Sequence, residues 1–168
     1  SLNAGSLWGR PFYILREAWN ILNAIAEGKI ESGDEKKLNA LKGETMAVIA
    51  LCQFDLTRCF GYPYTKDNGA SLGAPLIDHL VGTYENPSRS TVAQAYDFII
   101  ETLEEAVTLM SEEKNNGRMN KYAARALLAR VYLYHNDNRK AFDMAEQLIK
   151  DVDASGSYAL YPHEKYVA

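Results

Sequence analysis

The 168-residue sequence contains little cysteine, proline or glycine, with two Cys, five Pro and eleven Gly. It also lacks a long hydrophobic run. Strongly apolar stretches such as residues 46–51 are far shorter than the roughly 20 residues that a membrane-spanning helix needs. The few prolines and glycines occur in clusters, which predicts long helices separated by a small number of loops.

An excess of positive charge is missing as well. The chain carries 18 basic and 22 acidic side chains, for a net charge of −4. It therefore lacks the basic field that a nucleic-acid-binding protein requires. A composition that is 47% hydrophobic and 24% charged excludes intrinsic disorder, and the length suits a single domain.

Apolar residues that recur at spacings of three and four predict five helices and no strand. We expect these helices over about residues 11–26, 33–60, 91–110, 120–135 and 139–152. Residues 61–90 contain most of the loop signals and no clear period. The predicted fold class is all-α, built from antiparallel helical hairpins with one long loop. The first helix should pair with the second and the fourth with the fifth, and the third should lie between them.

Local signals set the expected helix boundaries. Pro11 suits the first turn of a helix. Ser32 with Glu35, and Thr91 with Gln94, have the spacing of capping boxes.

Two cysteines, Cys52 and Cys59, are seven residues apart on the second predicted helix. Two helical turns separate them by about 10 Å, which is too far for a disulfide. We expect both to be small buried side chains.

Charged residues among apolar neighbours predict an ion pair between helices. The fourth predicted helix offers only cations, whereas the second and third offer carboxylates. We expect Arg130, or failing it Arg125, to pair with Glu44, Asp55 or a carboxylate of the third helix.

The fourth helix is apolar nearly all round. We therefore expect the fourth and fifth helices and the segment from residue 158 to leave apolar surface uncovered.

Catalytic and cofactor motifs are not found. The sequence has no glycine-rich phosphate loop, no HExxH and no Gly-x-Ser-x-Gly. The three histidines stand alone, and Glu104-Glu105 point about 100° apart on a helix, so they cannot act as a catalytic pair. We expect no enzyme activity, no metal and no cofactor.

The fourth and fifth predicted helices resemble a tetratricopeptide-type hairpin. Leu128-Ala129, Tyr132 and Ala141 have the spacing that packs small residues against a partner helix. The later aromatic residue of that pattern is replaced by Ala145.

The chain as a whole resembles the SusD/RagB family of outer-membrane nutrient-binding lipoproteins. Five stretches carry the resemblance in family order: Gly43-Glu44 through Gly61, the loop at 62–75, Arg89 through Ala106, residues 118–134 and residues 155–160. Family members are much longer. We therefore expect residues 1–168 to form a single helical domain, a portion that lacks the lipoprotein signal and the C-terminal half.

This resemblance implies a binding function at the cell surface. The expected role is capture of a nutrient, an oligosaccharide or alternatively a peptide, for a SusC-type TonB-dependent transporter. The expected location is the outer membrane, facing outward, through a lipid anchor absent from this chain. No nucleic-acid partner is expected. The alternative is a helical-repeat adaptor that binds protein partners in a groove.

The resemblance also implies which residues could contact a sugar. The family stacks aromatic faces on pyranose rings and reaches the hydroxyls with Asn, Asp and Arg. The candidate ligand-binding residues are Trp8, Tyr62, Tyr64, Asp67 and Asn68. The alternative for each is a packing role, in which it fills gaps between helices or lies under the long loop.

Overall fold

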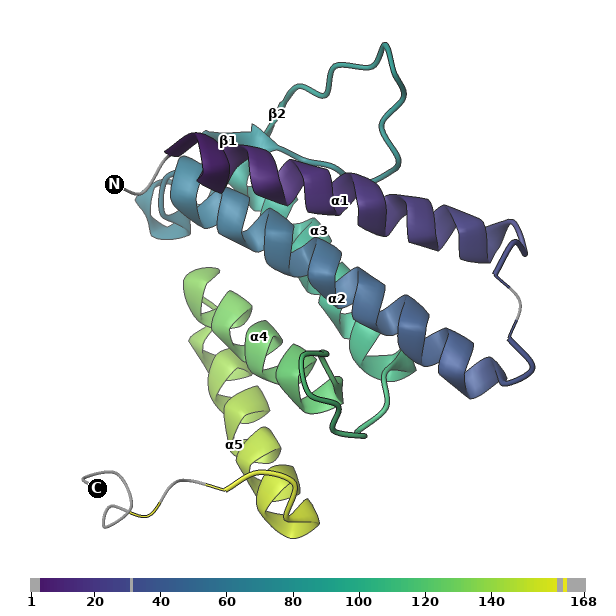
Figure 1. Cartoon of the computed structure of the whole chain (residues 1–168). Coiled ribbons are helices and arrows are strands. Elements are labelled where there is room, and N and C mark those ends of the chain that lie inside the picture. Colours follow the sequence, from purple (N-terminus) through teal and green to yellow (C-terminus); the bar gives the residue numbers. More distant parts are fainter. Residues whose placement is uncertain (1–3, 31, 160–161, 163–168) are drawn as a thin grey trace.

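The residues that the structure describes form five α-helices, and a small two-stranded sheet comes between the second and third helices along the chain (Figure 1). The computed structural model describes residues 4–30, 32–159 and 162. The elements are α1 (Ala4–Ala26), α2 (Glu35–Phe60), the 3₁₀ turn η1 (Tyr64–Lys66), β1 (Leu72–Pro75), β2 (Arg89–Thr91), α3 (Val92–Leu109), α4 (Lys121–Tyr134) and α5 (Asn138–Ser155). The predicted all-α class is confirmed.

Each helix packs against the next one along the chain. Short connections join α1 to α2 and α4 to α5, whereas residues 61–91, which include both strands, join α2 to α3. α1 and α2 form one hairpin and α4 and α5 another, and α3 contacts both α2 and α4 (Figure 1). The predicted pairing of the helices is therefore confirmed.

The start of α1 differs from the prediction. The helix is already formed at Ala4, so Pro11 lies inside it and not in its first turn. Trp8 explains the extension, because its ring contacts Phe12 one turn later and Phe60 at the end of α2. Tertiary contacts of this kind outweigh the local preference of proline for a helix start.

The predicted cap of α2 is also wrong by two residues. Asp34, not Ser32, is the N-cap, and its carboxylate accepts hydrogen bonds from the backbone N–H groups of Lys36 and Lys37. The Ser32 hydroxyl instead donates to the Asp34 carbonyl. The capping box of α3 is confirmed, with Thr91 and Gln94 bonded reciprocally.

Two short strands were not predicted. β1 pairs antiparallel with β2, with Leu72 opposite Thr91 and Pro75 opposite Arg89. The Arg89 side chain also donates to the Gly73 carbonyl oxygen at 2.7 Å. Strands of four and three residues are too short to show an alternating pattern, so only this non-local pairing defines them.

The core consists of two clusters of buried side chains on opposite sides of α2. The larger lies between α2, α3 and α4 and includes Phe54, Ile99, Leu103, Leu128 and Val131. The smaller lies between α1, α2 and the β1 segment and includes Leu15, Ile49, Leu56, Ala74 and Ile77. α2 is therefore buried on two sides, as its broad apolar surface predicts.

Gly43 sets the close approach of α2 to α3. A Cβ atom at this position would lie 2.7 Å from Met110 Cγ and 2.9 Å from the Ala106 carbonyl oxygen. Because both distances are below normal contact, only glycine fits without a shift of one helix.

The interhelical ion pairs differ from the prediction. Glu44 binds Arg118 of the α3–α4 loop, and Asp55 binds Arg58 on its own helix. Arg125 of α4 is nearly buried and binds Asp151 of α5 at 2.6 Å. Arg130 is exposed. The predicted partners were wrong because the face of α4 that carries Arg125 packs on α5 and not on α2.

The cysteine prediction is half right. Cys52 is buried, whereas Cys59 is exposed, and both are free thiols. Burial, with a smaller contribution from the nearby Asp55 carboxylate, raises the pKa of Cys52 to about 11. Cys52 therefore stays a neutral packing residue.

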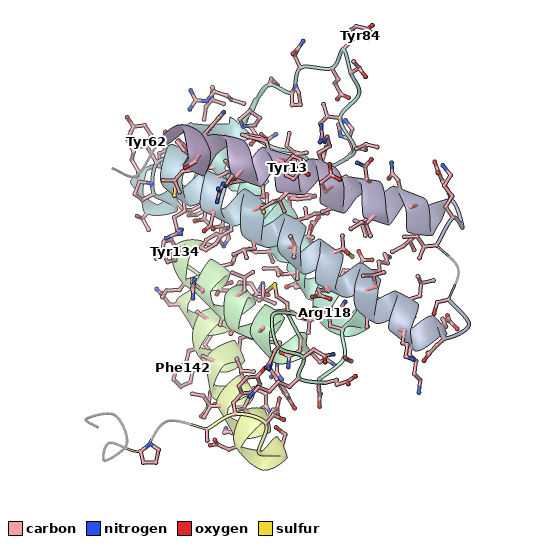
Figure 2. All side chains as sticks on the ribbon, viewed as in Figure 1. Tyr13, Tyr62, Tyr84, Arg118, Tyr134 and Phe142 are labelled. Carbon is pink, nitrogen blue, oxygen red and sulfur yellow. The ribbon has the colours of Figure 1, made fainter. Side chains whose placement is uncertain are left out.

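Apolar side chains are exposed on the second hairpin, as predicted. Phe142 and Ile149 of α5 are each 61% exposed, and Phe142 projects outward from the helix (Figure 2). Leu133, Tyr134 and Tyr158 are exposed as well. Phe142 and Ile149 are two turns apart, so they share one face of α5.

Candidate functional site

Aromatic side chains gather where α1 begins and α2 ends. The Trp8 ring meets Phe12 and Phe60 edge-on, with centroid separations of 5.0 and 4.7 Å, and is 39% exposed. Because Trp8 contacts Phe60 and Tyr62 follows Phe60 by two residues, Trp8 and Tyr62 lie at the same end of the α1–α2 hairpin. Figure 2 shows Tyr62 at that end. We refer to Trp8, Phe60 and Tyr62 as the aromatic end.

Tyr62 is exposed and contacts one cation. Its side chain is 57% exposed. The Lys66 ammonium lies 3.0 Å from the centre of the Tyr62 ring, in a cation–π contact. Lys66 therefore covers part of the ring, and the exposed part of the side chain is available for contact with a ligand.

Tyr64 is in a different environment. It packs against the larger core cluster, with its ring 5.7 Å from that of Tyr96 and 4.3 Å from that of His135. Burial, with a smaller contribution from Tyr134, raises the pKa of Tyr96 to about 12. The Nδ1 atom of His135 is buried and has no hydrogen-bond partner among the described residues. Tyr64 thus joins η1 to α3 and α4 in the way that the packing alternative describes.

Asp67 and Asn68 form a turn. The Asp67 carboxylate accepts a hydrogen bond from the Ser71 hydroxyl, which holds the pKa of that carboxyl below its usual range. Asn68 has a φ of 55°, and Gly69 a φ of 77°. A Cβ on Gly69 would lie 2.7 Å from the Ala93 backbone nitrogen, so this turn packs directly on the start of α3. The side chains of Asp67 and Asn68 are exposed beside η1.

Two hollows on the surface of the described residues lie away from these side chains. A groove of about 640 Å³ lies between the start of α2 and the α3–α4 loop, and is lined by Lys36, Leu41, Glu44, Met110 and Arg118 among others. A second cavity of about 480 Å³ lies between α1 and the loop that joins β1 to β2. None of the five predicted ligand-binding residues lines either hollow.

The structure therefore places Trp8 and Tyr62 at the same end of the α1–α2 hairpin, and Asp67 and Asn68 follow Tyr62 on the same loop. It adds Phe60, which the sequence analysis included only as the last residue of the expected helix 33–60. The packing of α1 on α2 shows that Phe60 contacts Trp8.

Metal and membrane features can be assessed only for the part of the chain that is described. There, no group of three or more His, Cys, Asp and Glu side chains is placed to bind a metal ion. None of the helices formed by residues 4–30 and 32–159 combines the length and the hydrophobicity that a bilayer crossing requires.

Solved structures similar to this chain come from Bacteroides. A SusD superfamily protein from Bacteroides vulgatus is 95% identical over 99% of this chain, with a TM-score of 0.96. A SusD superfamily protein from Bacteroides thetaiotaomicron is 41% identical over 95% of it, with a TM-score of 0.89. This chain covers only 38% and 34% of those two proteins, about a third of their length.

The same fold extends to more distant proteins. A SusD-like carbohydrate-binding protein from Bacteroides vulgatus is 22% identical over 95% of this chain, with a TM-score of 0.81. No functionally curated protein matches the chain. The family model SusD-like 3, described as "Starch-binding associating with outer membrane", matches residues 3–133, which include α1 through most of α4. The chain therefore belongs to the SusD-like family of starch-binding proteins associated with the outer membrane.

Proposed function

We propose that this chain is the helical scaffold of a cell-surface protein that captures glycans and passes them to a SusC-type TonB-dependent transporter in the outer membrane. The observation that carries the proposal is the family match over residues 3–133. The role is binding and not catalysis. A lipid anchor outside residues 1–168 would hold the protein at the membrane.

The proposal includes a division of labour along a longer protein. The chain covers about a third of its structural relatives, so residues 1–168 would form one helical domain and further segments would complete the ligand site. Phe142 and Ile149 are exposed on one face of α5, and this is the surface that a further segment would cover.

Within this chain, the aromatic end is the surface that we propose for sugar contact. Trp8 and Tyr62 are exposed and are held by Phe60 and Lys66, so both rings are oriented before a ligand arrives. Rigid aromatic faces bind with little loss of conformational entropy. Asp67 and Asn68 would supply polar groups from the adjacent turn, and Tyr64 would support that turn from the core side.

The transporter partnership can be tested with the tagged protein expressed in its source bacterium. The protein is purified from detergent-solubilised outer membranes, and co-purifying proteins are identified by mass spectrometry. We expect a TonB-dependent transporter to be recovered in comparable amount, and we expect external protease to remove the protein from intact cells. Recovery from the soluble cytoplasmic fraction together with soluble partners would contradict the proposal and favour the helical-repeat adaptor.

A further inference from the structure

The loop that joins β1 to β2 is fixed at both ends. At its start, the Trp19 indole Nε1–H donates to the Ile77 carbonyl oxygen at 3.1 Å. Gln53 of α2 accepts from the Ile77 N–H and donates to the Pro75 carbonyl. At its far end, Arg89 donates to two carbonyls of β1. Residues 78–88 therefore span two anchored points and extend beyond α1 (Figure 1).

This loop forms one wall of the 480 Å³ cavity. Phe12 and Arg16 line the cavity from α1, and residues 81–83 line it from the loop. The remaining lining is mostly apolar. The cavity is already partly open to solvent, and because the loop lines one side of it, a movement of residues 81–83 away from α1 widens its opening.

A histidine between two carboxylates holds the loop in this conformation. His79 Nδ1 lies 2.6 Å from an Asp78 carboxylate oxygen, and His79 Nε2 lies 2.7 Å from a Glu85 carboxylate oxygen. The other Glu85 oxygen accepts the Gly82 N–H at 3.1 Å. Glu85 thus closes residues 79–85 into a ring and holds the cavity-lining Gly82.

The geometry requires a charged histidine. A neutral imidazole has one N–H donor and an imidazolium has two. Both ring nitrogens of His79 face carboxylate oxygens, so both contacts are hydrogen bonds only when the ring carries two protons. When the ring loses one proton to solvent, a nitrogen lone pair faces a carboxylate, and one of the two contacts becomes repulsive.

We propose that Asp78, His79 and Glu85 form a protonation-dependent latch that keeps the 78–88 loop folded along one side of the cavity, and that deprotonation of His79 releases the loop and widens the cavity. The device is local to this loop and does not depend on the proposed function.

The pKa shifts of the latch residues agree with a latch that is closed when His79 is charged. Hydrogen bonds to Asp78 and then to Glu85 raise the pKa of His79 above its ordinary value near 6.5. The Gly82 N–H, and then His79, lower the pKa of Glu85. These are the charged groups that act on His79. Arg16, the charged residue of α1 on the cavity wall, is paired with Glu17.

The sign of the pH effect follows. A raised histidine pKa stabilises the closed loop fully below pH 6.5, and this stabilisation is lost as the pH rises through the raised value. A lowered Glu85 pKa stabilises it above the ordinary glutamate pKa, and this is lost as the pH falls through the lowered value. The latch therefore holds between the two shifted values and opens on the alkaline side.

Chymotrypsin cleavage after Tyr84 tests the proposal, because this side chain is 95% exposed at the tip of the loop (Figure 2). The cleavage rate is divided by that of a small peptide substrate at each pH, and mass spectrometry identifies the site. When opening is fast, cleavage follows the population of the open loop, so we expect a rise of about threefold or more between about pH 5.5 and pH 8.5. The His79→Gln variant should be cleaved at a rate that does not change with pH.

NMR of the histidine ring protons supplies an independent readout, with His79 assigned from its absence in H79Q. We expect His79 to titrate above its ordinary value, and to return toward that value in Glu85→Gln. The midpoint of the cleavage curve should coincide with this titration. An equal pH response in wild type and H79Q, or a His79 that titrates at or below its ordinary value, would overturn the latch.

Discussion

Glu44 of α2 binds Arg118 of the α3–α4 loop through both Nε and a terminal nitrogen of the guanidinium group. The second Glu44 oxygen accepts the Met119 N–H at 3.2 Å. One carboxylate therefore fixes the loop that leads into α4, and so sets how the α4–α5 hairpin approaches α2. Arg118 lies beside α2 at this junction (Figure 2).

Replacing Glu44 by Gln should lower the free energy of unfolding by about 1–2 kcal/mol, because the half-buried carboxylate makes charge-assisted hydrogen bonds. Urea unfolding measures the change. The matched control is Glu105→Gln, which removes a pair with Lys42 that also joins α2 to a neighbour but is exposed. The control should change stability by less than about 0.5 kcal/mol. Equal effects of the two variants would show that Glu44 does not fix the loop.

Replacing Gly43 by Ala should destabilise the protein by about 1–3 kcal/mol, because the new methyl group would overlap Met110 and the Ala106 carbonyl. Gly9→Ala is the matched control, since Gly9 is also helical but has no neighbour within 4 Å of a Cβ. This control should stabilise the protein by about 0.5–1 kcal/mol. Thermal unfolding of both variants tests whether their stabilities change in opposite directions. A G43A protein as stable as wild type would mean that α3 can move away at no cost.

Removing the carboxylate of the Arg125–Asp151 pair should lower the free energy of unfolding more than removing the cation. The side chain of Arg125 is 12% exposed and that of Asp151 is 37% exposed. Asp151→Asn leaves a nearly buried guanidinium without its counter-charge, so we expect it to be the more destabilising change. Arg125→Met leaves a carboxylate that water can reach, so we expect the smaller loss of stability. Denaturant unfolding of the two single variants decides the order, and a larger loss for R125M would reverse our account of the pair.

Glycan binding by residues 1–168 alone should be undetectable, or in the millimolar range, because the chain covers only about a third of its structural relatives. Calorimetry with a panel of oligosaccharides measures this. Micromolar affinity would refute the prediction. In that case Trp8→Ala and Tyr62→Ala should weaken binding, whereas Tyr13→Ala, which removes another exposed aromatic ring on α1, should not.

Replacing Phe142 on the exposed face of α5 should change stability less in residues 1–168 than in the longer protein. Phe142→Gln should change the stability of residues 1–168 by less than about 0.5 kcal/mol, because the side chain is 61% exposed. In the longer protein we expect a loss of about 1–2 kcal/mol, from a contact with a further segment. Calorimetric scans of both proteins make the comparison, with Lys150→Gln on the same helix as the control. No difference between the two proteins would mean that this face contacts solvent in both.

Local signals in the sequence determined the helices and several of their ends. Apolar spacing defined all five, and the Thr91–Gln94 capping box placed the start of α3, because such interactions involve residues within one or two turns. The five stretches that resemble the SusD/RagB family, among them residues 118–134, also predicted the family. These stretches carry the packing residues of the scaffold.

The tertiary structure decided everything that depends on which surfaces meet. The partner of Arg125 is Asp151 and that of Glu44 is Arg118, although helix periodicity allowed several other pairs. Tyr64 and Tyr62 are two residues apart, yet one enters the core and the other reaches solvent. Charge, ring and strand partners are distant in sequence, and their contact energies depend on the positions of whole helices. No local pattern encodes those positions, because they result from the packing of both core clusters together.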